Sequence, residues 1–222
     1  MYGNFCKALA AKGFVVVNST YRLSPHVRHP EHVRDTAKAL KWIYTEIHRF
    51  GGDRNKIFVS GHSAGGFITA SLSLNPSYLN ELGLSTKIIK GCVGISGVYD
   101  VSRIANWKSP VTLFNKFVLF SIPICTFGKN DPKLFFRESP VNLLTGEVSP
   151  CPFLLFSAKR DFQLEKDAQK LDQVLRSRDI KVKYVHYNDG DHVSIVGLFS
   201  PNLKVVDEIS RWIVERCDSL NE

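Results

Sequence analysis

The residues best suited to chemistry lie in the pentapeptide Gly-His-Ser-Ala-Gly at positions 61–65. An apolar run, Lys56–Ser60, precedes it, and the segment after it, Gly66–Leu72, has the apolar content of a buried helix. A G-x-S-x-G sequence between a strand and a helix is typical of a sharp turn that exposes the serine hydroxyl above a sheet. The start of the helix adds free N–H groups and a positive dipole end, both of which stabilise an oxyanion. The pattern also occurs by chance as a plain turn, but this setting favours Ser63 as a nucleophile.

A serine hydroxyl is a poor nucleophile until a base removes its proton and a carboxylate orients that base. In a parallel sheet such groups gather where the strands end, and this turn is typically followed by an acid and then a histidine. Asp161 follows an apolar run at residues 152–157, and His192 follows a second run at residues 182–187. We therefore expect Ser63, Asp161 and His192 to form a catalytic triad.

The other histidines and acids are weaker candidates because of where they fall. His186 lies in the middle of a predicted strand, and His62 lies inside the turn, from which it cannot easily reach back to Ser63. The rest are histidines that precede the serine, acids in an irregular or helical segment, and acids that flank His192 and are expected to shape its turn. They are His26, His29, His32, Asp131, Asp167, Asp189 and Asp191.

Buried strands and helices alternate along the chain. Apolar runs, several of them rich in β-branched residues, predict strands at residues 14–18, 57–59, 89–96, 152–157 and 182–187. Apolar residues at helical spacing predict helices at residues 32–50, 66–72, 164–178 and 203–217. This alternation indicates an α/β fold in which a mostly parallel sheet is covered by helices on both faces.

The segment from about residue 99 to residue 150 interrupts this alternation. It is long for a loop and rich in aromatic residues, Pro and Asn, so we expect an inserted cap or lid. Its aromatic side chains either wall a pocket for hydrophobic or aromatic substrates or pack the core of the cap. They are Trp107, Phe114, Phe117, Phe120 and Phe127. Because no repeat or low-complexity linker divides the chain, we expect residues 1–222 to form one domain.

The composition restricts the class of protein. With 222 residues, 44% of them hydrophobic and 23% charged, the chain can bury a full globular core. A net charge of +8 could suit nucleic acid, but the basic residues are scattered and no nucleic-acid-binding motif accompanies them, so we expect no such partner. The five cysteines lack C-x-x-C spacing, which argues against a zinc site or a disulfide framework and for a reducing compartment.

The sequence has neither a signal-peptide pattern nor a membrane-spanning pattern. Residues 1–7 contain no apolar core of the signal-peptide type. The most apolar stretch, residues 117–125, is too short to cross a bilayer and contains Pro123. We therefore expect a cytoplasmic protein without an integral membrane span, and the sequence leaves its oligomeric state open.

Several segments together resemble the α/β-hydrolase superfamily. The most similar branch contains the hormone-sensitive-lipase-like carboxylesterases, feruloyl-esterase-like hydrolases, prenylcysteine methylesterases and kynurenine formamidases. The resemblance implies that Ser63 is the nucleophile, His192 the general base and then acid, and Asp161 the orienting carboxylate. The matching stretches are Tyr21–Pro25, His29-Pro30 with Asp35, Trp42, Gly51–Asp53, Gly61–Gly66, Gly97–Asp100, Asp161 and Asp191-His192.

The sequence departs from that family at its beginning. These families carry a His-Gly-Gly loop before the first helix, and the backbone N–H groups of that loop supply half of the oxyanion hole. Here the chain begins at Met1-Tyr2-Gly3, and Gly3 looks like part of a helix. The sequence also lacks a match to three early strands of the family's fold, one of which lies near the centre of the sheet. By this resemblance only the N–H of Ala64 remains as an oxyanion donor, so we expect an N-terminally truncated form: a partial gene model, a splice variant or a degenerate copy.

The expected reaction is hydrolysis of a small-molecule carboxylic ester through an acyl-enzyme, with no metal or cofactor. Two alternatives stay open. One is an aryl formamidase that cleaves an N-formyl amide, since Gly97–Asp100 suits either branch. The other is an inactive hydrolase-fold protein that acts by binding or has no function. The intact Ser63, Asp161 and His192 argue against decay of the site, whereas the missing loop argues for it.

Overall fold

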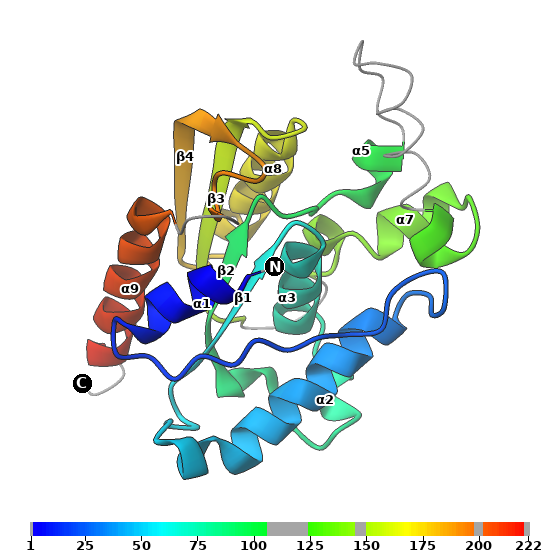
Figure 1. Ribbon diagram of the computed structural model, residues 1–222. Helices are drawn as coiled ribbons and strands as arrows, with labels where there is room; N and C mark the ends of the chain where they lie inside the picture. The colour runs from blue at the N-terminus through cyan, green and yellow to red at the C-terminus, as the bar shows by residue number, and fades with distance from the viewer. Residues whose placement is uncertain (1, 106–123, 145–149, 198–201, 220–222) are drawn as a thin grey trace.

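A parallel sheet forms the centre of the computed structural model, which describes residues 2–105, 124–144, 150–197 and 202–219 (Figure 1). Within these residues the sheet has four strands in the order β1-β2-β3-β4, and every neighbouring pair is parallel. The strands are β1 (Ile57–His62), β2 (Ile89–Ile95), β3 (Phe153–Arg160) and β4 (Val182–Asp191).

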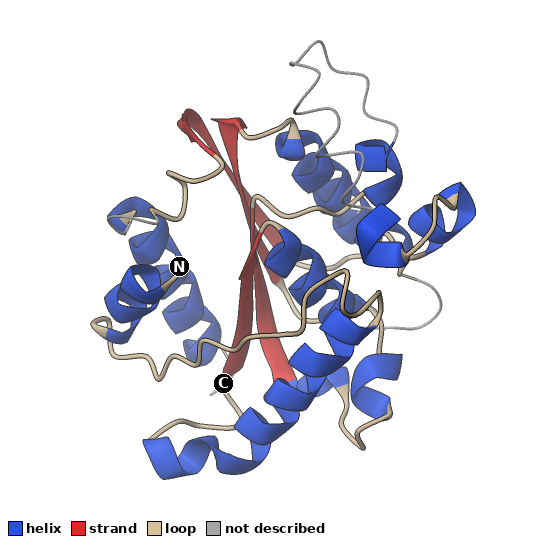
Figure 2. Ribbon diagram, turned by 45° about the vertical axis from the view of Figure 1, so that its right-hand side comes forward, coloured by secondary structure: helices blue, strands red, loops and turns tan. Residues whose placement is uncertain are grey.

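Helices cover both faces of the sheet, as Figure 2 shows. One face packs against α1 (Gly3–Ala10) and α9 (Leu203–Asp218). The other face packs against helices from three further segments of the chain. These are α2 (Glu31–Glu46), α3 (Ala64–Leu74) and α8 (Leu164–Arg176). The expected α/β fold is therefore confirmed.

The two inner strands supply side chains to both faces in alternation. Val93 and Ile95 of β2 lie in the cluster beneath α1 and α9, whereas Cys92 lies in the cluster beneath α3 and α8. Leu154 and Leu155 of β3 divide in the same way. Because successive side chains of a strand point to opposite faces, a strand buried on both faces must be apolar throughout. The continuous apolar runs in the sequence meet this requirement.

Most of the predicted elements are present, with ends shifted by a few residues. The long helix expected at residues 32–50 is α2 followed by a 3-10 turn, η1 (Ile47–Phe50). The described residues also contain shorter helical elements that the sequence did not predict. They are α4 (Ser77–Asn80), η2 (Thr86–Ile88), α5 (Val101–Ala105), α7 (Pro132–Arg137) and η3 (Pro140–Asn142).

The predicted strand at residues 14–18 is wrong. These residues belong to no strand, and they make no backbone hydrogen bond to β1 or to another described strand. Phe14 and Val16 pack against the cluster beneath α1 and α9, while Val15 and Val17 remain 45% and 42% exposed. The segment therefore has the alternation and residue types of a strand but lacks a hydrogen-bonded neighbour, and strand propensity does not substitute for one.

The segment at residues 99–150 is described only in part. Of its aromatic residues, Trp107, Phe114, Phe117 and Phe120 lie outside the described residues. Phe127 is buried and lies against Phe135, with ring centroids 5.4 Å apart, so it packs as core. None of the described helices has the length and apolar content that a membrane crossing requires.

Candidate active site

Ser63 occupies a single-residue turn between strand and helix. β1 ends at His62 and α3 begins at Ala64, and Ser63 has φ 56° and ψ −118°. A non-glycine residue in this region carries strain of about 1–3 kcal/mol, which the surrounding structure must hold. The Ser63 N–H donates to the Ile95 carbonyl of β2 at 3.0 Å, and the Ser63 carbonyl accepts from Gly66 N at 3.0 Å. The sheet and the helix thus fix the serine from both sides.

Two of the glycines around the serine are required by close backbone contacts. A Cβ at Gly61 would lie 2.1 Å from the Gly65 carbonyl oxygen, and a Cβ at Gly66 would lie 2.7 Å from the Gly97 Cα. A Cβ at Gly65 would meet no atom within 4 Å. The G-x-S-x-G motif therefore combines a glycine that the turn needs at position 61 with one at position 65 that packing does not demand.

Asp161 and His192 are joined by a short hydrogen bond. Asp161 follows β3 directly, and His192 follows β4 directly, so the parallel pairing of these strands brings both to the same edge of the sheet. His192 Nδ1 lies 2.6 Å from Asp161 Oδ1, and the Asp161 side chain is fully buried. Since a carboxylate only accepts, Nδ1 carries the proton, and Nε2 of the neutral ring is left free to act as a base.

The turn that carries His192 is shaped by the acid before it. The Asp191 carboxylate accepts hydrogen bonds from the backbone N–H of Val193 at 3.0 Å and of Ser194 at 2.9 Å. These bonds lower the pKa of the Asp191 carboxyl below its usual value. Asp191 therefore has the turn-forming role that its position indicates.

His192 also lies beside the serine turn. The rings of His62 and His192 have centroids 4.5 Å apart, and His62 Nε2 donates to the His192 carbonyl at 2.8 Å. Ser63 follows His62 directly, so all three predicted catalytic residues lie at the carboxyl edge of the sheet. The Ser63 hydroxyl has no hydrogen-bond partner among the described residues, so the structure does not form the serine–histidine bond of a triad. Such bonds often tighten only when substrate is present.

The Ala64 N–H is well placed to bind an oxyanion. Ala64 is exposed and is the first residue of α3, where the N–H groups have no acceptor within the helix. Within the described residues this N–H makes no backbone hydrogen bond. Gly3 begins α1, as expected from the sequence.

Three of the other candidate residues have structural partners elsewhere. His186 is exposed and shares a hydrogen bond of 2.9 Å with Ser157 across β3 and β4. Asp131 caps α7 by accepting from Leu134 N at 3.1 Å. Asp167 is buried, where it accepts from backbone N–H groups and pairs with an arginine.

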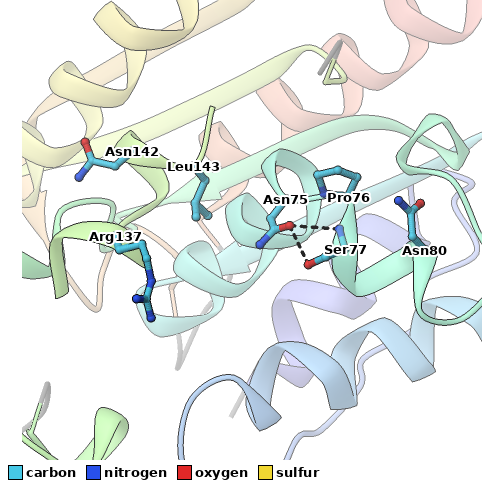
Figure 3. Close-up of a pocket in the computed structure, with 7 residues that line it drawn as sticks. All are labelled: Asn75, Pro76, Ser77, Asn80, Arg137, Asn142 and Leu143. Atoms are coloured by element: carbon cyan, nitrogen blue, oxygen red, sulfur yellow. Dashed lines mark hydrogen bonds between the residues drawn. The ribbon is translucent and has the colours of Figure 1, made fainter. Parts of the chain in front are cut away.

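Two hollows in the described surface lie outside this group of residues. The first, about 370 Å³, is lined by seven residues that Figure 3 labels. It includes Asn75, the C-cap of α3, and so lies at the opposite end of that helix from Ser63. The second, about 470 Å³, lies beside the His192 turn and includes Tyr187, Gly190 and Ser194. Neither is lined by Ser63, Asp161 or His192.

Comparison with known proteins gives the family. Residues 1–196 match a protein-family model described as the alpha/beta hydrolase fold. The chain belongs to this family. It is similar to esterase LipC of Mycobacterium tuberculosis, with 36% identity over 161 residues, 69% of this chain and 38% of LipC. It is also similar to the probable isoprenylcysteine alpha-carbonyl methylesterase ICMEL2 of Arabidopsis thaliana, with 24% identity over 195 residues, 84% of this chain and 45% of that protein. The chain thus spans less than half the length of either relative.

Solved structures of two esterases share the fold. An inhibited esterase B from Lactobacillus rhamnosis superimposes with a TM-score of 0.81 at 19% identity, covering 99% of this chain and 72% of that one. A Pyrobaculum calidifontis esterase superimposes with a TM-score of 0.73 at 22% identity, covering 97% and 70%. At these identities the likeness establishes the architecture.

Proposed function

We propose that this chain is a serine hydrolase that cleaves carboxylic esters through an acyl-enzyme. The observation that carries the proposal is the hydrogen bond between Asp161 and His192, placed beside a strained serine turn at the carboxyl edge of a hydrolase-fold sheet. The esterase names of LipC and of the other relatives support ester rather than amide substrates.

The first half of the reaction forms the acyl-enzyme. Ser63 Oγ attacks the ester carbonyl carbon while His192 Nε2 removes the hydroxyl proton. Asp161 keeps the proton of Nδ1 in place and stabilises the imidazolium. The Ala64 N–H donates to the developing oxyanion, where a single donor contributes a factor of about 100 to 1000 in rate. His192 then protonates the leaving alcohol as the carbon–oxygen bond breaks.

The second half releases the acid. Water attacks the acyl carbon, His192 takes a proton from that water, and the proton returns to Ser63 as the acyl–oxygen bond breaks. Side chains and one backbone N–H supply every step, so the proposed reaction uses no metal or cofactor. We also propose that the protein is cytoplasmic and that residues 1–222 form one domain with a cap.

Hydrolysis by the purified 222-residue chain tests this function. The substrate panel should contain p-nitrophenyl esters of increasing acyl length and N-formyl aryl amides, with Ser63→Ala as the matched control. The proposal predicts ester hydrolysis that the substitution abolishes. Preferential cleavage of the formyl amides would instead assign a formamidase. A folded wild-type chain with the same background rate as Ser63→Ala would refute a hydrolase and favour a role in binding.

A further inference from the structure

Two hydrogen bonds link Tyr2, which immediately precedes α1, to the backbone of His192 through His62, the residue before Ser63. The Tyr2 hydroxyl lies 2.9 Å from His62 Nδ1, and His62 Nε2 lies 2.8 Å from the His192 carbonyl oxygen. Tyr2 and His62 also meet edge to face, with ring centroids 5.8 Å apart. These bonds join parts of the molecule that are 60 and 130 residues apart in sequence.

The hydrogen-bond partners of His62 determine which of its two ring nitrogens carries the proton. A carbonyl oxygen only accepts, so His62 Nε2 must carry a proton. In a neutral imidazole the other nitrogen is then an acceptor, and the Tyr2 hydroxyl donates to it. Burial, with the nearby His192 second, lowers the pKa of His62 to about 4, so the ring is neutral at physiological pH. The His192 carbonyl therefore selects the Nε2–H tautomer of His62, and the hydrogen bond from Tyr2 stabilises that tautomer.

This contact holds His192 at a second point. Asp161 holds the imidazole at Nδ1, and the His62 N–H holds the backbone of the same residue. His62 is adjacent to Ser63 in the chain, so its bond ties the histidine turn directly to the nucleophile turn. At the start of this turn His192 is only partly buried and Val193 is 41% exposed, and close packing begins only at Ile195, so packing constrains His192 itself weakly.

We propose that His62, oriented by Tyr2, is a positioning residue that holds His192 against the nucleophile turn. The proposal rests on the proposed function, because its consequence is the distance between His192 Nε2 and Ser63 Oγ. An error of about 1 Å in such a distance can lower the rate roughly 100-fold. His62 itself touches neither the substrate nor a proton in transfer.

Three substitutions test the two hydrogen bonds of His62 separately. His62→Leu removes the donor to His192, and we expect kcat to fall about 10- to 100-fold with KM within about 3-fold of wild type. His62→Gln places an amide N–H near the position of Nε2 and should restore most of that loss. Tyr2→Phe removes one hydroxyl and should lower kcat about 2- to 10-fold, the size of one net hydrogen bond. His48→Leu, at an exposed histidine of η1, is the control for the exchange itself.

Two readouts keep the test decisive. The rate of Ser63 labelling by a fluorophosphonate, measured on variants with cooperative thermal unfolding, should follow the same order as kcat. Nitrogen-15 NMR of the histidine rings should show His62 as the neutral Nε2–H tautomer in wild type and a mixture of tautomers in Tyr2→Phe. If His62→Leu does not fold, the labelling rate of Tyr2→Phe and the NMR spectrum still test the positioning role of His62.

The outcomes distinguish this proposal from the proposed function. Labelling of His62→Leu at the wild-type rate would overturn the positioning role and leave the hydrolase proposal intact. An Nδ1–H tautomer of His62 would overturn it as well. Absence of labelling in the folded wild-type chain would refute the hydrolase proposal, and the positioning role would fall with it even if the Nε2–H tautomer were found.

Discussion

At the scale of single residues, the site depends on two backbone turns and one buried carboxylate. Ser63 is held in a strained conformation by bonds to β2 and α3, and Asp161 is fully buried beneath the ring it orients. Neighbouring groups hold both features in place. A site that must keep its geometry during a reaction requires such support.

Replacing the buried carboxylate should abolish most activity without unfolding the chain. Asp161→Asn keeps the shape of the side chain but presents an amide, which favours the tautomer of His192 with the proton on Nε2. We expect kcat for ester hydrolysis to fall about 10³- to 10⁴-fold. Thermal unfolding should stay cooperative, and KM should change only a few-fold. A loss of kcat smaller than about 10-fold would exclude Asp161 from the triad.

The glycines at positions 61 and 65 should respond in opposite directions. Gly61→Ala forces a Cβ against the Gly65 carbonyl, and we expect a loss of about 1–3 kcal/mol in the free energy of unfolding, or more if the turn cannot relax. In Gly65→Ala the added Cβ meets open space in the first turn of α3. The free energy of unfolding should therefore stay the same or rise by up to about 1 kcal/mol. Urea denaturation of the pair measures both. Equal effects would contradict the described turn.

The low pKa of His62 should make stability depend on pH. Its ordinary pKa of 6.5 is lowered to about 4 in the folded chain, so between these values the unfolded state binds a proton that the folded state does not. The free energy of unfolding should therefore fall by up to about 3 kcal/mol as the pH drops from about 6.5 to about 4. Asp35, with its pKa lowered to about 2, loses its contribution only at lower pH.

Denaturation across this pH range checks the effect. His62→Gln does not titrate and should show a flatter dependence than the wild type. The same slope in both proteins would mean that other groups cause the loss of stability.

At the scale of elements, the local sequence pattern predicted whether a segment forms a strand or a helix. It did not predict which segments pair in the sheet. The strands β1 to β4 follow from continuous apolar runs, and α2, α8 and α9 follow from helical spacing. The segment at residues 14–18 has an equally strong local pattern, yet it is not a strand, because strand formation depends on a hydrogen-bonded neighbour that no local window contains.

A buried carboxylate fastens the segment after β2 to α8. Asp167 accepts hydrogen bonds from Tyr99 N at 2.9 Å and Asp100 N at 3.1 Å, and it pairs with Arg103 of α5. Burial raises the pKa of Asp167 above its usual value, an effect that the arginine partly offsets. The network explains how the chain is fixed where it enters the segment at residues 99–150.

Two aspartates of α8 should therefore differ sharply in their effect on stability. Asp167→Leu leaves the arginine and two backbone N–H groups without their buried acceptor, and we expect a loss of about 3–5 kcal/mol. Asp172→Ala removes an exposed pair with Arg176 one helical turn away and should cost less than about 0.5 kcal/mol. Guanidinium denaturation separates the two. A loss below about 1 kcal/mol for Asp167→Leu would contradict the anchoring role.

At the scale of the whole molecule, the fold and the placement of the three candidate residues at one edge of the sheet could be predicted, because both depend on order along the chain. Each follows a strand of one parallel sheet, and parallel strands present their carboxyl ends at one edge. The contact of His62 with His192 could not be predicted in this way. It joins residues 130 apart through a backbone carbonyl, and the only signal in the sequence is that His62 adjoins Ser63, the proposed nucleophile.

β1 carries the serine turn and, within the described residues, lies at one edge of the sheet with β2 as its only strand neighbour. The site therefore depends on an element that is hydrogen-bonded to the sheet on one side. The chain also spans less than half the length of LipC and of ICMEL2. The proposed ester hydrolysis therefore depends first on whether this chain forms an activated Ser63.

The most direct measurement is labelling of the purified chain with a fluorophosphonate probe, followed by mass spectrometry of the modified peptide. We expect a covalent adduct on Ser63 that disappears in Ser63→Ala and forms at least about 10³-fold more slowly in Asp161→Asn. Gly65→Ala, as the folded control, should still be labelled. A cooperatively folded wild-type chain that acquires no adduct at Ser63 would show that Ser63 is not an activated nucleophile.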